Sequence, residues 1–315
     1  MARTFCATST TDEVLEGINL TGKIIVVTGA ASGLGTETSR ALAAKGAQVV
    51  LCGRSDSSLL AAEKTIRESV PSASLSRLAF DLADFASIRN GANELLQQQP
   101  RIDILINNAG IMACPLAHTE QGHELQFATN HLAHFLFTQL LTPALVTAGS
   151  ARVITLSSAA HKYSPVVFDD INYQSRPYEK WEAYGQSKTA NALFAVELGK
   201  RLAGAGVRSF AVHPGVIITN LARHLTEKDF EELMAESATN GIGMFFKSIP
   251  QGAATTVWAA TAPELTGSNS LYLEDCAIAN EVEEGNVESG YFAYAVDEAA
   301  AKRLWLLSEE LTRIV

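Results

Sequence analysis

From Lys23 onward, short runs rich in β-branched residues alternate with longer segments whose apolar residues recur at helical spacing. The short runs predict strands over Ile24 to Thr28, Gln48 to Cys52, Ser74 to Phe80, Ile102 to Asn107, Arg152 to Ser157, Arg208 to His213 and Ser270 to Leu273. The longer segments predict helices over Thr36 to Ala44, Ser57 to Ser69, Phe85 to Gln99, Gly122 to Thr147, Trp181 to Ala203 and Gln251 to Ala262. A parallel sheet with helices on both faces produces this alternation. The sequence therefore predicts an α/β fold, a single-domain Rossmann fold whose doubly wound parallel sheet has about seven strands.

Two stretches interrupt the alternation. Residues 161–180 are rich in Pro, Tyr, Asp and Asn, and residues 221–250 hold Met234, Met244, Phe245 and Phe246 among small residues. Loops beyond the carboxyl ends of strands bind ligands in open α/β sheets, so we expect both insertions to shape a substrate pocket. The alternative is that they are only surface insertions. We divide the chain into an N-terminal extension, residues 1–22, and one domain, residues 23–315.

Charge and cysteine spacing exclude several classes of function. The chain has 34 acidic and 24 basic residues, a formal net charge of −10, and no Lys/Arg cluster that could follow a phosphate backbone. We therefore expect no nucleic-acid partner. The cysteines are widely spaced, without histidines at metal-ligand spacing, and predict free thiols in a reducing compartment and no metal site. They are Cys6, Cys52, Cys114 and Cys276.

Hydropathy predicts no membrane anchor. The first residues lack the apolar stretch of a secretory signal. The longest apolar-leaning segment, His131 to Ala148, is interrupted by His134, Gln139 and Pro143, which suits a buried helix better than a membrane span. We expect a cytoplasmic protein.

A glycine-rich turn follows the first predicted strand, and the next helix begins directly after it. Its sequence is Thr28-Gly29-Ala30-Ala31-Ser32-Gly33-Leu34-Gly35. Glycine permits positive φ and close backbone approach, and a helix N-terminus offers unpaired N–H groups to a phosphate. This placement between strand and helix predicts a dinucleotide pyrophosphate site.

The second strand ends in Gly53 and Arg54, where an NAD-binding protein commonly places an acidic residue. A guanidinium pairs with a ribose 2′-phosphate through two hydrogen bonds, whereas a carboxylate would repel it. Arg54 therefore predicts that NADP(H) is preferred, with NAD(H) possible. Alternatively, Arg54 is a solvated loop residue.

Tyr184 and Lys188 are four residues apart in a helical segment, and so lie on one helix face. Reduction of a ketone by hydride leaves negative charge on oxygen, which requires a proton donor. A tyrosine has a pKa of about 10, and a neighbouring ammonium together with an oxidised nicotinamide favours its phenolate. The pair predicts proton transfer beside a nicotinamide.

Together these residues resemble the short-chain dehydrogenase/reductase family, over Lys23 to Asn220. The resemblance rests on the glycine-rich turn, Asp81-Leu82, Asn107-Asn108-Ala109-Gly110, Asn130, Ser157-Ser158, Tyr184-x-x-x-Lys188 and Pro214-Gly215-x-x-x-Thr219. Within the family, the chain is similar to the retinol dehydrogenase-like and WW-domain oxidoreductase-like branch. The phrases of that branch are Asn130-His131-Leu132-Ala133-His134-Phe135-Leu136, Gln186-Ser187-Lys188-Thr189-Ala190-Asn191 and His213-Pro214-Gly215-Val216. The chain departs from the branch in lacking a membrane anchor and WW modules.

The resemblance implies four catalytic residues. Tyr184 would be the general acid in reduction and the general base in oxidation, and Lys188 would also hold the nicotinamide ribose. Strand alternation points Ser157 and Ser158 to opposite faces, and the family pattern selects Ser158 to bond the substrate oxygen. Asn130 would hold water in a proton relay; alternatively, it is a buried residue at a helix kink.

The resemblance also implies the cofactor contacts. The glycine-rich turn, with Gly29, Ser32, Gly33, Leu34 and Gly35, would hold the phosphates. Other contacts would come from Arg54 at the 2′-phosphate, Asp81 and Leu82 at the adenine, Asn108, Ala109 and Gly110 at the adenosine ribose and central groove, and Pro214, Ile217 and Thr219 at the nicotinamide. For Asn107 to Gly110 the structural alternative is a tight strand-end turn. His213 is expected to be a hydrogen-bonded structural histidine rather than a catalyst.

The sequence thus predicts an NADP(H)-dependent oxidoreductase that interconverts a carbonyl and an alcohol on a lipophilic or aromatic small molecule. Alternatives are an NAD(H)-dependent alcohol dehydrogenase, an epimerase or dehydratase, and a nucleotide sensor without catalysis. The apolar residues of the two longest helical segments indicate a homodimer or homotetramer. The tail from Glu281 to Val315 could cover that face instead.

Overall fold

The computed structural model describes residues 5–231, 245–283 and 289–313. In these ranges the chain forms an eight-stranded sheet with the order β3-β2-β1-β4-β5-β6-β7-β8. The strands are β1 (Ile24–Thr28), β2 (Gln48–Gly53), β3 (Ser74–Ala79), β4 (Ile104–Asn107), β5 (Arg152–Leu156), β6 (Arg208–His213), β7 (Leu271–Glu274) and β8 (Ala277–Ile278). The order reverses direction between β1 and β4, which is the switch point where such sheets bind ligands.

Seven strands are parallel, which confirms the predicted doubly wound sheet. The sequence did not predict the two-residue strand β8, which pairs antiparallel with β7. The turn between these strands consists of Asp275 and Cys276, whose φ angles are 50° and 56°. Two central residues at positive φ form the turn that matches the twist of a hairpin. Strand β8 therefore covers the edge of β7.

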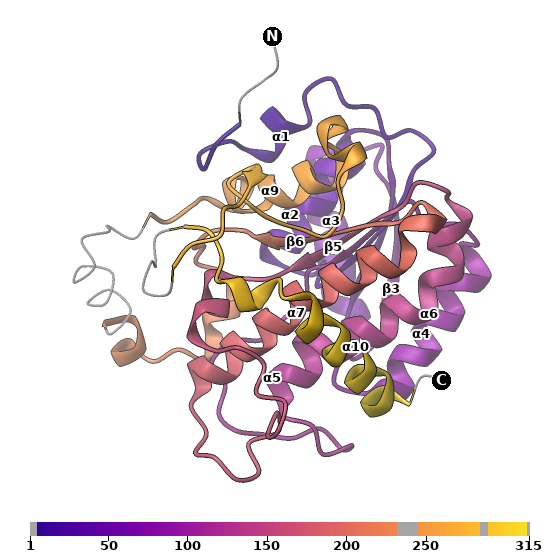
Figure 1. Cartoon of the computed structure of the whole chain (residues 1–315). Helices are drawn as coiled ribbons and strands as arrows, with labels where there is room; N and C mark the ends of the chain where they lie inside the picture. The colour runs from indigo at the N-terminus through magenta and orange to yellow at the C-terminus, as the bar shows by residue number, and fades with distance from the viewer. Residues whose placement is uncertain (1–4, 232–244, 284–288, 314–315) are drawn as a thin grey trace.

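Helices pack on both faces of the sheet (Figure 1). They are α1 (Thr11–Val14), α2 (Gly33–Ala44), α3 (Asp56–Ser69), α4 (Phe85–Gln98), α5 (Leu125–Phe127), α6 (Ala133–Thr147), α7 (Lys180–Leu202), α9 (Ile249–Thr261) and α10 (Glu298–Thr312). The short helices that concern the site are η1 (Ala128–Leu132), a π-helix, and the 3₁₀ helices η2 (Ala159–Tyr163) and η4 (Asn220–His224). Helices α2 and α9 pack together on one face, and α4, α6 and α7 lie on the other.

The predicted single helix over residues 122–147 is wrong at its start. Gly122 has a φ of 84°, and a β-bridge pairs His118 with Glu124. The helix begins only at Leu125, where the Glu124 side chain accepts hydrogen bonds from the N–H groups of Gln126 and Phe127. A π-helical segment then separates α5 from α6.

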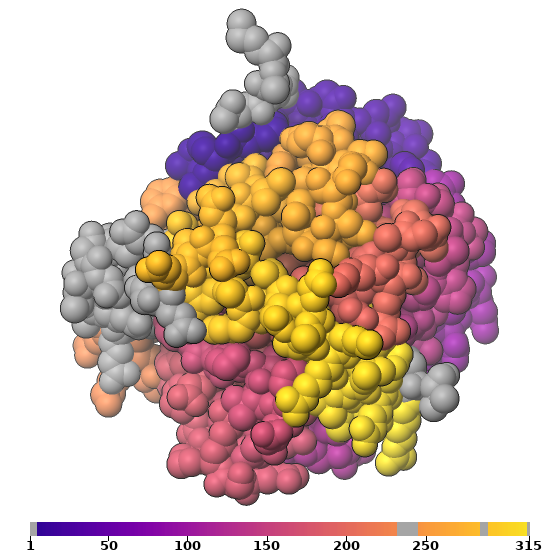
Figure 2. All heavy atoms as spheres, in the orientation of Figure 1, coloured from indigo at the N-terminus to yellow at the C-terminus, as the bar shows by residue number. Residues whose placement is uncertain are grey.

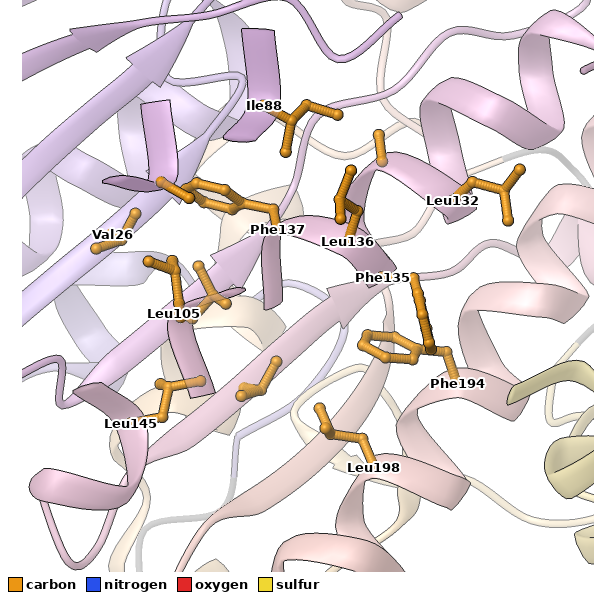
Figure 3. Packing of buried hydrophobic residues seen from close by; sticks show 14 of the residues in the cluster. Val26, Ile88, Leu105, Leu132, Phe135, Leu136, Phe137, Leu145, Phe194 and Leu198 are labelled. Carbon is orange, nitrogen blue, oxygen red and sulfur yellow. The ribbon is translucent and has the colours of Figure 1, made fainter. Parts of the chain in front are cut away.

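Each face of the sheet has its own hydrophobic core. The core under α4, α6 and α7 contains Phe135, Phe137 and Phe194, all at most 2% exposed. Figure 3 shows Phe135 of α6 beside Phe194 of α7. The core of the other face includes Leu15 and Leu20, which precede the first strand. The N-terminal residues around α1 are therefore packed on the sheet layer, against α2 and α9.

The C-terminal helix α10 is an element that the sequence analysis did not predict. It packs along α7 and reaches α6. Trp305 lies 5.0 Å from Phe135 and 6.0 Å from Phe194, measured between ring centroids. In Figure 2 the C-terminal residues (yellow) form a band over this side of the molecule. Helix α10 thus covers the apolar surface that α6 and α7 would otherwise expose.

Candidate active site

The predicted catalytic pair lies on the buried face of α7. Tyr184 and Lys188 are each 4% exposed. The Lys188 ammonium is 5.5 Å from the centroid of the Tyr184 ring, and its Nζ donates a hydrogen bond of 3.0 Å to the Leu156 carbonyl at the end of β5. The Asn191 side chain donates to the same carbonyl at 2.9 Å. Helix α7 therefore holds the phenol and the amine side by side at the carboxyl end of the sheet.

The two serines after β5 have different partners. The Ser157 hydroxyl donates to the Lys188 carbonyl at 2.9 Å and is buried. The Ser158 hydroxyl accepts the Ala160 N–H at 3.1 Å and is close enough to the Tyr184 phenol to lower its pKa. Because the Lys188 backbone uses Ser157, Ser158 is the serine that is positioned beside the reactive phenol.

Burial has the largest effect on the pKa values of Tyr184 and Lys188. It raises the pKa of Tyr184 to about 12, with a smaller lowering effect from the Ser158 hydrogen bond. It lowers the pKa of Lys188 to about 8. Burial of the phenol therefore opposes the phenolate that the amine and an oxidised nicotinamide are expected to favour, and the phenolate stays a prediction.

Asn130 lies in the π-helix η1 and joins three parts of the site. Its Oδ1 accepts the Ile111 N–H at 2.8 Å, and its Nδ2 donates to the Ile111 carbonyl and to Ser187 Oγ, both at 2.9 Å. Ser187 in turn donates to the Tyr184 carbonyl at 2.7 Å. A π-turn of this kind is frequent at functional sites, because it redirects side chains and frees carbonyls.

The glycine-rich turn has the close packing that a pyrophosphate site requires. Gly29 and Gly33 have φ angles of 66° and 55°. A Cβ at Gly29 would lie 2.8 Å from Ala109 Cα, and a Cβ at Gly35 would lie 2.2 Å from the Gly29 carbonyl oxygen. Ser32 is the N-cap residue of α2, and Leu34 is in its first turn. The backbone thus leads directly into a helix N-terminus, and this arrangement fits a nucleotide diphosphate.

The strand-end residues after β4 connect the turn to the predicted catalytic residues. Asn108 Nδ2 donates to the Thr28 carbonyl at 2.8 Å, and the Ala109 N–H donates to the Thr28 hydroxyl at 3.0 Å. A Cβ at Gly110 would lie 3.2 Å from Asn130 Oδ1 and 3.6 Å from Lys188 Nζ. Asn108, Ala109 and Gly110 therefore bridge the phosphate turn and the amine.

The residues after β6 meet the start of α2. A Cβ at Gly33 would contact Thr219 Cγ2 at 3.3 Å, and Ile217 and Leu34 both lie against Gly252 of α9. Gly215, which follows Pro214, has a φ of 95°. The structure thus brings the predicted nicotinamide contacts next to the predicted phosphate contacts.

Arg54 is exposed just after β2. A Cβ at the neighbouring Gly53 would lie 3.8 Å from Ala31 Cβ, so this strand end adjoins the glycine-rich turn. No ion pair involves Arg54 within the described ranges. Its guanidinium therefore remains available to a ligand.

Asp81 and Leu82 follow β3 on the same edge of the sheet. The Asp81 carboxylate accepts the Ala83 N–H at 2.9 Å, and the Asp81 N–H donates to Ser87 Oγ at 2.9 Å. Leu82 packs partly buried against the hydrophobic core. These contacts fix the turn after β3. Among the described residues, no hydrogen bond joins the side chain of Asp81 or Leu82 to the glycine-rich turn.

His134 is a site residue that the sequence analysis missed. Its Nδ1 lies 2.9 Å from the Asn130 carbonyl, which can only accept, so Nδ1 donates and Nε2 accepts from the Thr28 hydroxyl at 2.9 Å. Burial lowers the pKa of His134 to about 4, which keeps it neutral. The sequence did carry a signal, because His134 is four residues after Asn130 and thus one helical turn away. It joins the π-helix to the phosphate turn.

The two insertions pack beside this site. Gln186 of α7 forms two hydrogen bonds with the first insertion, residues 161–180. Its side chain accepts the Val167 N–H at 3.0 Å and donates to the Ile171 carbonyl at 3.1 Å. In the second insertion Asp229 forms an ion pair with Lys180 at the start of α7. Residues 232–244, including Met234 and Met244, lie outside the described residues.

No group of three or more His, Cys, Asp or Glu side chains is placed to hold a metal ion in the described ranges. None of the helices in the same ranges is long and apolar enough to cross a membrane. His213 Nδ1 accepts the Ala159 N–H at 3.2 Å, so its ring serves the backbone next to Ser158.

Comparison with known proteins identifies relatives along nearly the whole chain. A family model described as short chain dehydrogenase matches residues 23–229. A Streptomyces lividans protein named "Probable oxidoreductase" is 43% identical over 91% of this chain and 97% of its own length. Human retinol dehydrogenase 13 is 40% identical over 92% of this chain and 84% of its own length.

Two solved structures show the same fold. The crystal structure of an uncharacterized protein from Mycobacterium paratuberculosis is 33% identical, with a TM-score of 0.74, and the match covers 97% of this chain and 98% of that chain. The RhlG/NADP complex from Pseudomonas aeruginosa is 26% identical, with a TM-score of 0.63, over 81% and 95% of the two chains.

Proposed function

Since the chain belongs to the short-chain dehydrogenase family and is an NAD(P)-dependent oxidoreductase acting on CH–OH groups, we propose a finer function. In this proposal it is an NADP(H)-dependent carbonyl reductase or alcohol dehydrogenase for lipophilic or aromatic small molecules. The observation that carries the proposal is the buried Tyr184 beside Ser158 and Lys188, at the end of the sheet where the glycine-rich turn also lies.

The cofactor would lie along the carboxyl ends of the strands. The turn from Gly29 to Gly35 holds its phosphates, Ile217 and Thr219 contact the nicotinamide end, and Asp81 and Leu82 contact the adenine. When bound, the nicotinamide supplies or accepts the hydride. The exposed guanidinium of Arg54 supports a preference for the 2′-phosphate of NADP(H), because no ion pair with another described residue neutralises it. The solved RhlG relative was crystallised with NADP.

The protein's own groups move the proton. Ser158 orients the substrate oxygen, and Tyr184 gives a proton to that oxygen in reduction or takes one in oxidation. Lys188 and the Asn130 region restore the protonation of Tyr184. The high pKa that burial gives Tyr184 keeps the phenol protonated at neutral pH, which is the form that donates a proton in carbonyl reduction.

Exposed apolar side chains support a lipophilic substrate. Ile218, Phe245 and Phe246 are 63%, 53% and 39% exposed, and a β-bridge joins Phe246 to Val216 beside the predicted nicotinamide contacts. Human retinol dehydrogenase 13 is named for an apolar alcohol. An apolar substrate would cover surface that water otherwise contacts.

The test of the function is nicotinamide absorbance with NADPH or NADH and a panel of ketones, aldehydes and alcohols. We expect turnover of apolar or aromatic carbonyls with NADPH at a higher kcat/KM than with NADH. Cofactor binding without turnover of any compound would favour the sensor, and a preference for NADH would favour the NAD(H)-dependent alcohol dehydrogenase.

Arg54→Asp tests the cofactor preference. Loss of a charge-assisted pair and gain of a repelling carboxylate should raise the apparent KM for NADPH at least about tenfold while changing that for NADH little. Lys64→Asp is the matched control, because it makes the same charge change at an exposed position of the next helix. Equal effects of Arg54→Asp on the two cofactors would contradict the assignment.

A further inference from the structure

The backbone carbonyl of Ser158 is held by an unusual number of donors. It accepts the His161 N–H at 3.0 Å, His161 Nδ1 at 2.7 Å and the Tyr272 hydroxyl at 3.1 Å. The Tyr272 hydroxyl also lies 3.2 Å from His161 Nδ1. The His161 N–H bond is local to helix η2, but the other two donors are side chains that have no other role in forming this turn.

His161 has a fixed tautomer. Its side chain is fully buried, and its Nε2 lies 3.3 Å from the Phe292 N–H, which can only donate. Nε2 is therefore the acceptor, and Nδ1 carries the hydrogen that faces the Ser158 carbonyl. Burial lowers the pKa of His161 to about 4, so the ring remains neutral through the physiological range.

The groups around His161 come from the C-terminal part of the chain. Tyr272 is on β7, and Phe292 and Tyr294 follow β8. The His161 ring lies 5.2 Å from the Tyr272 ring and 6.2 Å from the Phe292 ring, centroid to centroid. The Tyr294 hydroxyl donates to the His161 carbonyl at 2.7 Å. These residues contact the turn after β5 through the His161 ring, the His161 carbonyl and the Ser158 carbonyl.

Restraint of this carbonyl determines where the serine hydroxyl points. The carbonyl belongs to the peptide plane between Ser158 and Ala159, so fixing it fixes ψ of Ser158, which is 158°. The next peptide plane, between Ala159 and Ala160, carries the N–H that donates to Ser158 Oγ at 3.1 Å. The position of the hydroxyl relative to Tyr184 therefore depends on the carbonyl behind it.

We propose that Tyr272 and His161 are positioning residues, which hold the Ser158 peptide so that its hydroxyl stays beside Tyr184. The inference rests on the proposed function, in which Ser158 and Tyr184 act on the substrate oxygen. Neither residue touches the substrate; both act through the serine. Tyr272 on β7 and Phe292, whose N–H fixes the His161 tautomer, thus act on the serine from outside the residues that match the family model.

Tyr272→Phe is the first test, with Tyr294→Phe as its matched control. Both variants delete one phenolic hydroxyl around His161, but only Tyr272 donates to the Ser158 carbonyl. A lost hydrogen bond in a buried site corresponds to a rate change of about three- to tenfold. We expect Tyr272→Phe to lower kcat by this factor with the NADPH Kd unchanged, and Tyr294→Phe to remain within about twofold of wild type.

The pH profile supplies a readout that general loosening would not move. The Ser158 hydrogen bond lowers the pKa of Tyr184, so a displaced serine should raise it. Alcohol oxidation requires the deprotonated phenol. In the complex, where an oxidised nicotinamide favours the phenolate, the pH midpoint of kcat for oxidation should therefore move to higher pH in Tyr272→Phe and stay in place in Tyr294→Phe.

His161→Asn and His161→Leu test the second donor. Asparagine can place an N–H near the position of Nδ1, whereas leucine cannot, so His161→Asn should retain several times more kcat than His161→Leu. Circular dichroism melting identifies a variant that fails to fold, and the tyrosine pair then carries the test.

The outcomes separate this inference from the proposed function. Near-normal turnover in Tyr184→Phe would overturn the proposed function itself. Loss of turnover in Tyr184→Phe together with equal behaviour of Tyr272→Phe and Tyr294→Phe, in both kcat and pH midpoint, would overturn only the positioning role.

Discussion

Two influences act on the pKa of Tyr184 in opposite directions. Burial raises it, the Ser158 hydroxyl lowers it, and burial has the larger effect. Sequence spacing correctly placed the phenol and amine on one helix face, because four residues correspond to about one helical turn. Spacing does not reveal burial, which raises the pKa of the phenol and lowers that of the amine. The sequence therefore predicted which two residues lie together, but it could not predict their protonation states.

Tyr184→Phe tests the proton donor directly. Removal of the hydroxyl keeps the ring in its buried position, so we expect at least about a hundredfold loss of kcat, in the range of general acid–base contributions. Binding of NADPH, followed by its fluorescence, should stay within a fewfold of wild type. Turnover close to wild type would show that another group supplies the proton.

Hydrogen bonds to the backbone are the other property of single residues that the sequence hid. His134 donates to the carbonyl of Asn130, one helical turn earlier. His161 and Tyr272 both donate to the carbonyl of Ser158, and Tyr272 is distant from it in the chain. No pattern in the sequence identifies such partners, because they depend on the tertiary arrangement. The motif glycines were easier to assign, since positive φ and close approach impose a residue type at a known place.

At the scale of elements, strands were predicted more accurately than helix boundaries. The strands β1, β5 and β6 end within one residue of the prediction, because buried β-branched runs stop where polar motif residues begin. The π-helix η1 was not predictable from apolar periodicity, since its residues are buried on all sides. Helix α10 did carry a signal, with buried Ala301, Leu304, Trp305 and Ser308 at helical spacing.

Trp305→Ala tests how much α10 contributes to stability. Trp305 is 4% exposed and packs on Phe135 and Phe194, with the Arg201 guanidinium 4.5 Å above its ring. Its truncation should lower the free energy of unfolding by about 3 kcal/mol. Chemical denaturation followed by far-ultraviolet circular dichroism measures this loss.

Leu306→Ala is the matched control for that measurement. Leu306 is the next residue of α10 but is 52% exposed, so its truncation should change stability by less than about 0.5 kcal/mol. Equal losses in the two variants would mean that α10 is not docked through its tryptophan.

At the scale of the whole molecule, the C-terminal segments cover surfaces that could otherwise form interfaces. Helix α10 lies on α7 and α6, and β8 pairs with the edge of β7. The apolar residues of α6 and α7, which the sequence analysis connected to a homodimer or homotetramer, are therefore buried within one chain. We propose that the protein is a monomer, the alternative in which the tail covers this face.

Light scattering coupled to size exclusion checks the assembly. The expected mass is that of one chain, 33.7 kDa. A mass of two or four chains at micromolar concentration would contradict the monomer and would direct attention to surfaces away from α10.

Stability should fall in mild acid because several histidines are buried and neutral. Burial lowers the pKa of His131 to about 3 and that of His134 to about 4, from 6.5. Between these values and 6.5 the unfolded chain binds more protons than the folded one, so the free energy of unfolding decreases as pH falls through this window. Each such histidine contributes up to about 1.4 kcal/mol per pH unit.

Thermal melting at pH 7 and pH 5 measures this effect. The Tm should be clearly lower at pH 5, and replacement of His224, which is exposed, by glutamine should leave the difference unchanged. A Tm that is equal at the two pH values would contradict neutral burial of the histidines.

The contacts of Tyr272 and Phe292 with the turn after β5 have a consequence for biosynthesis. A ribosome completes every motif of the family long before it adds β7, the segment after β8 and α10. A nascent chain, or the product of a late stop codon, would therefore carry all of the catalytic side chains without the groups that orient the serine. Full turnover would then appear only after Tyr272 and Phe292 have been synthesised and have folded against the turn.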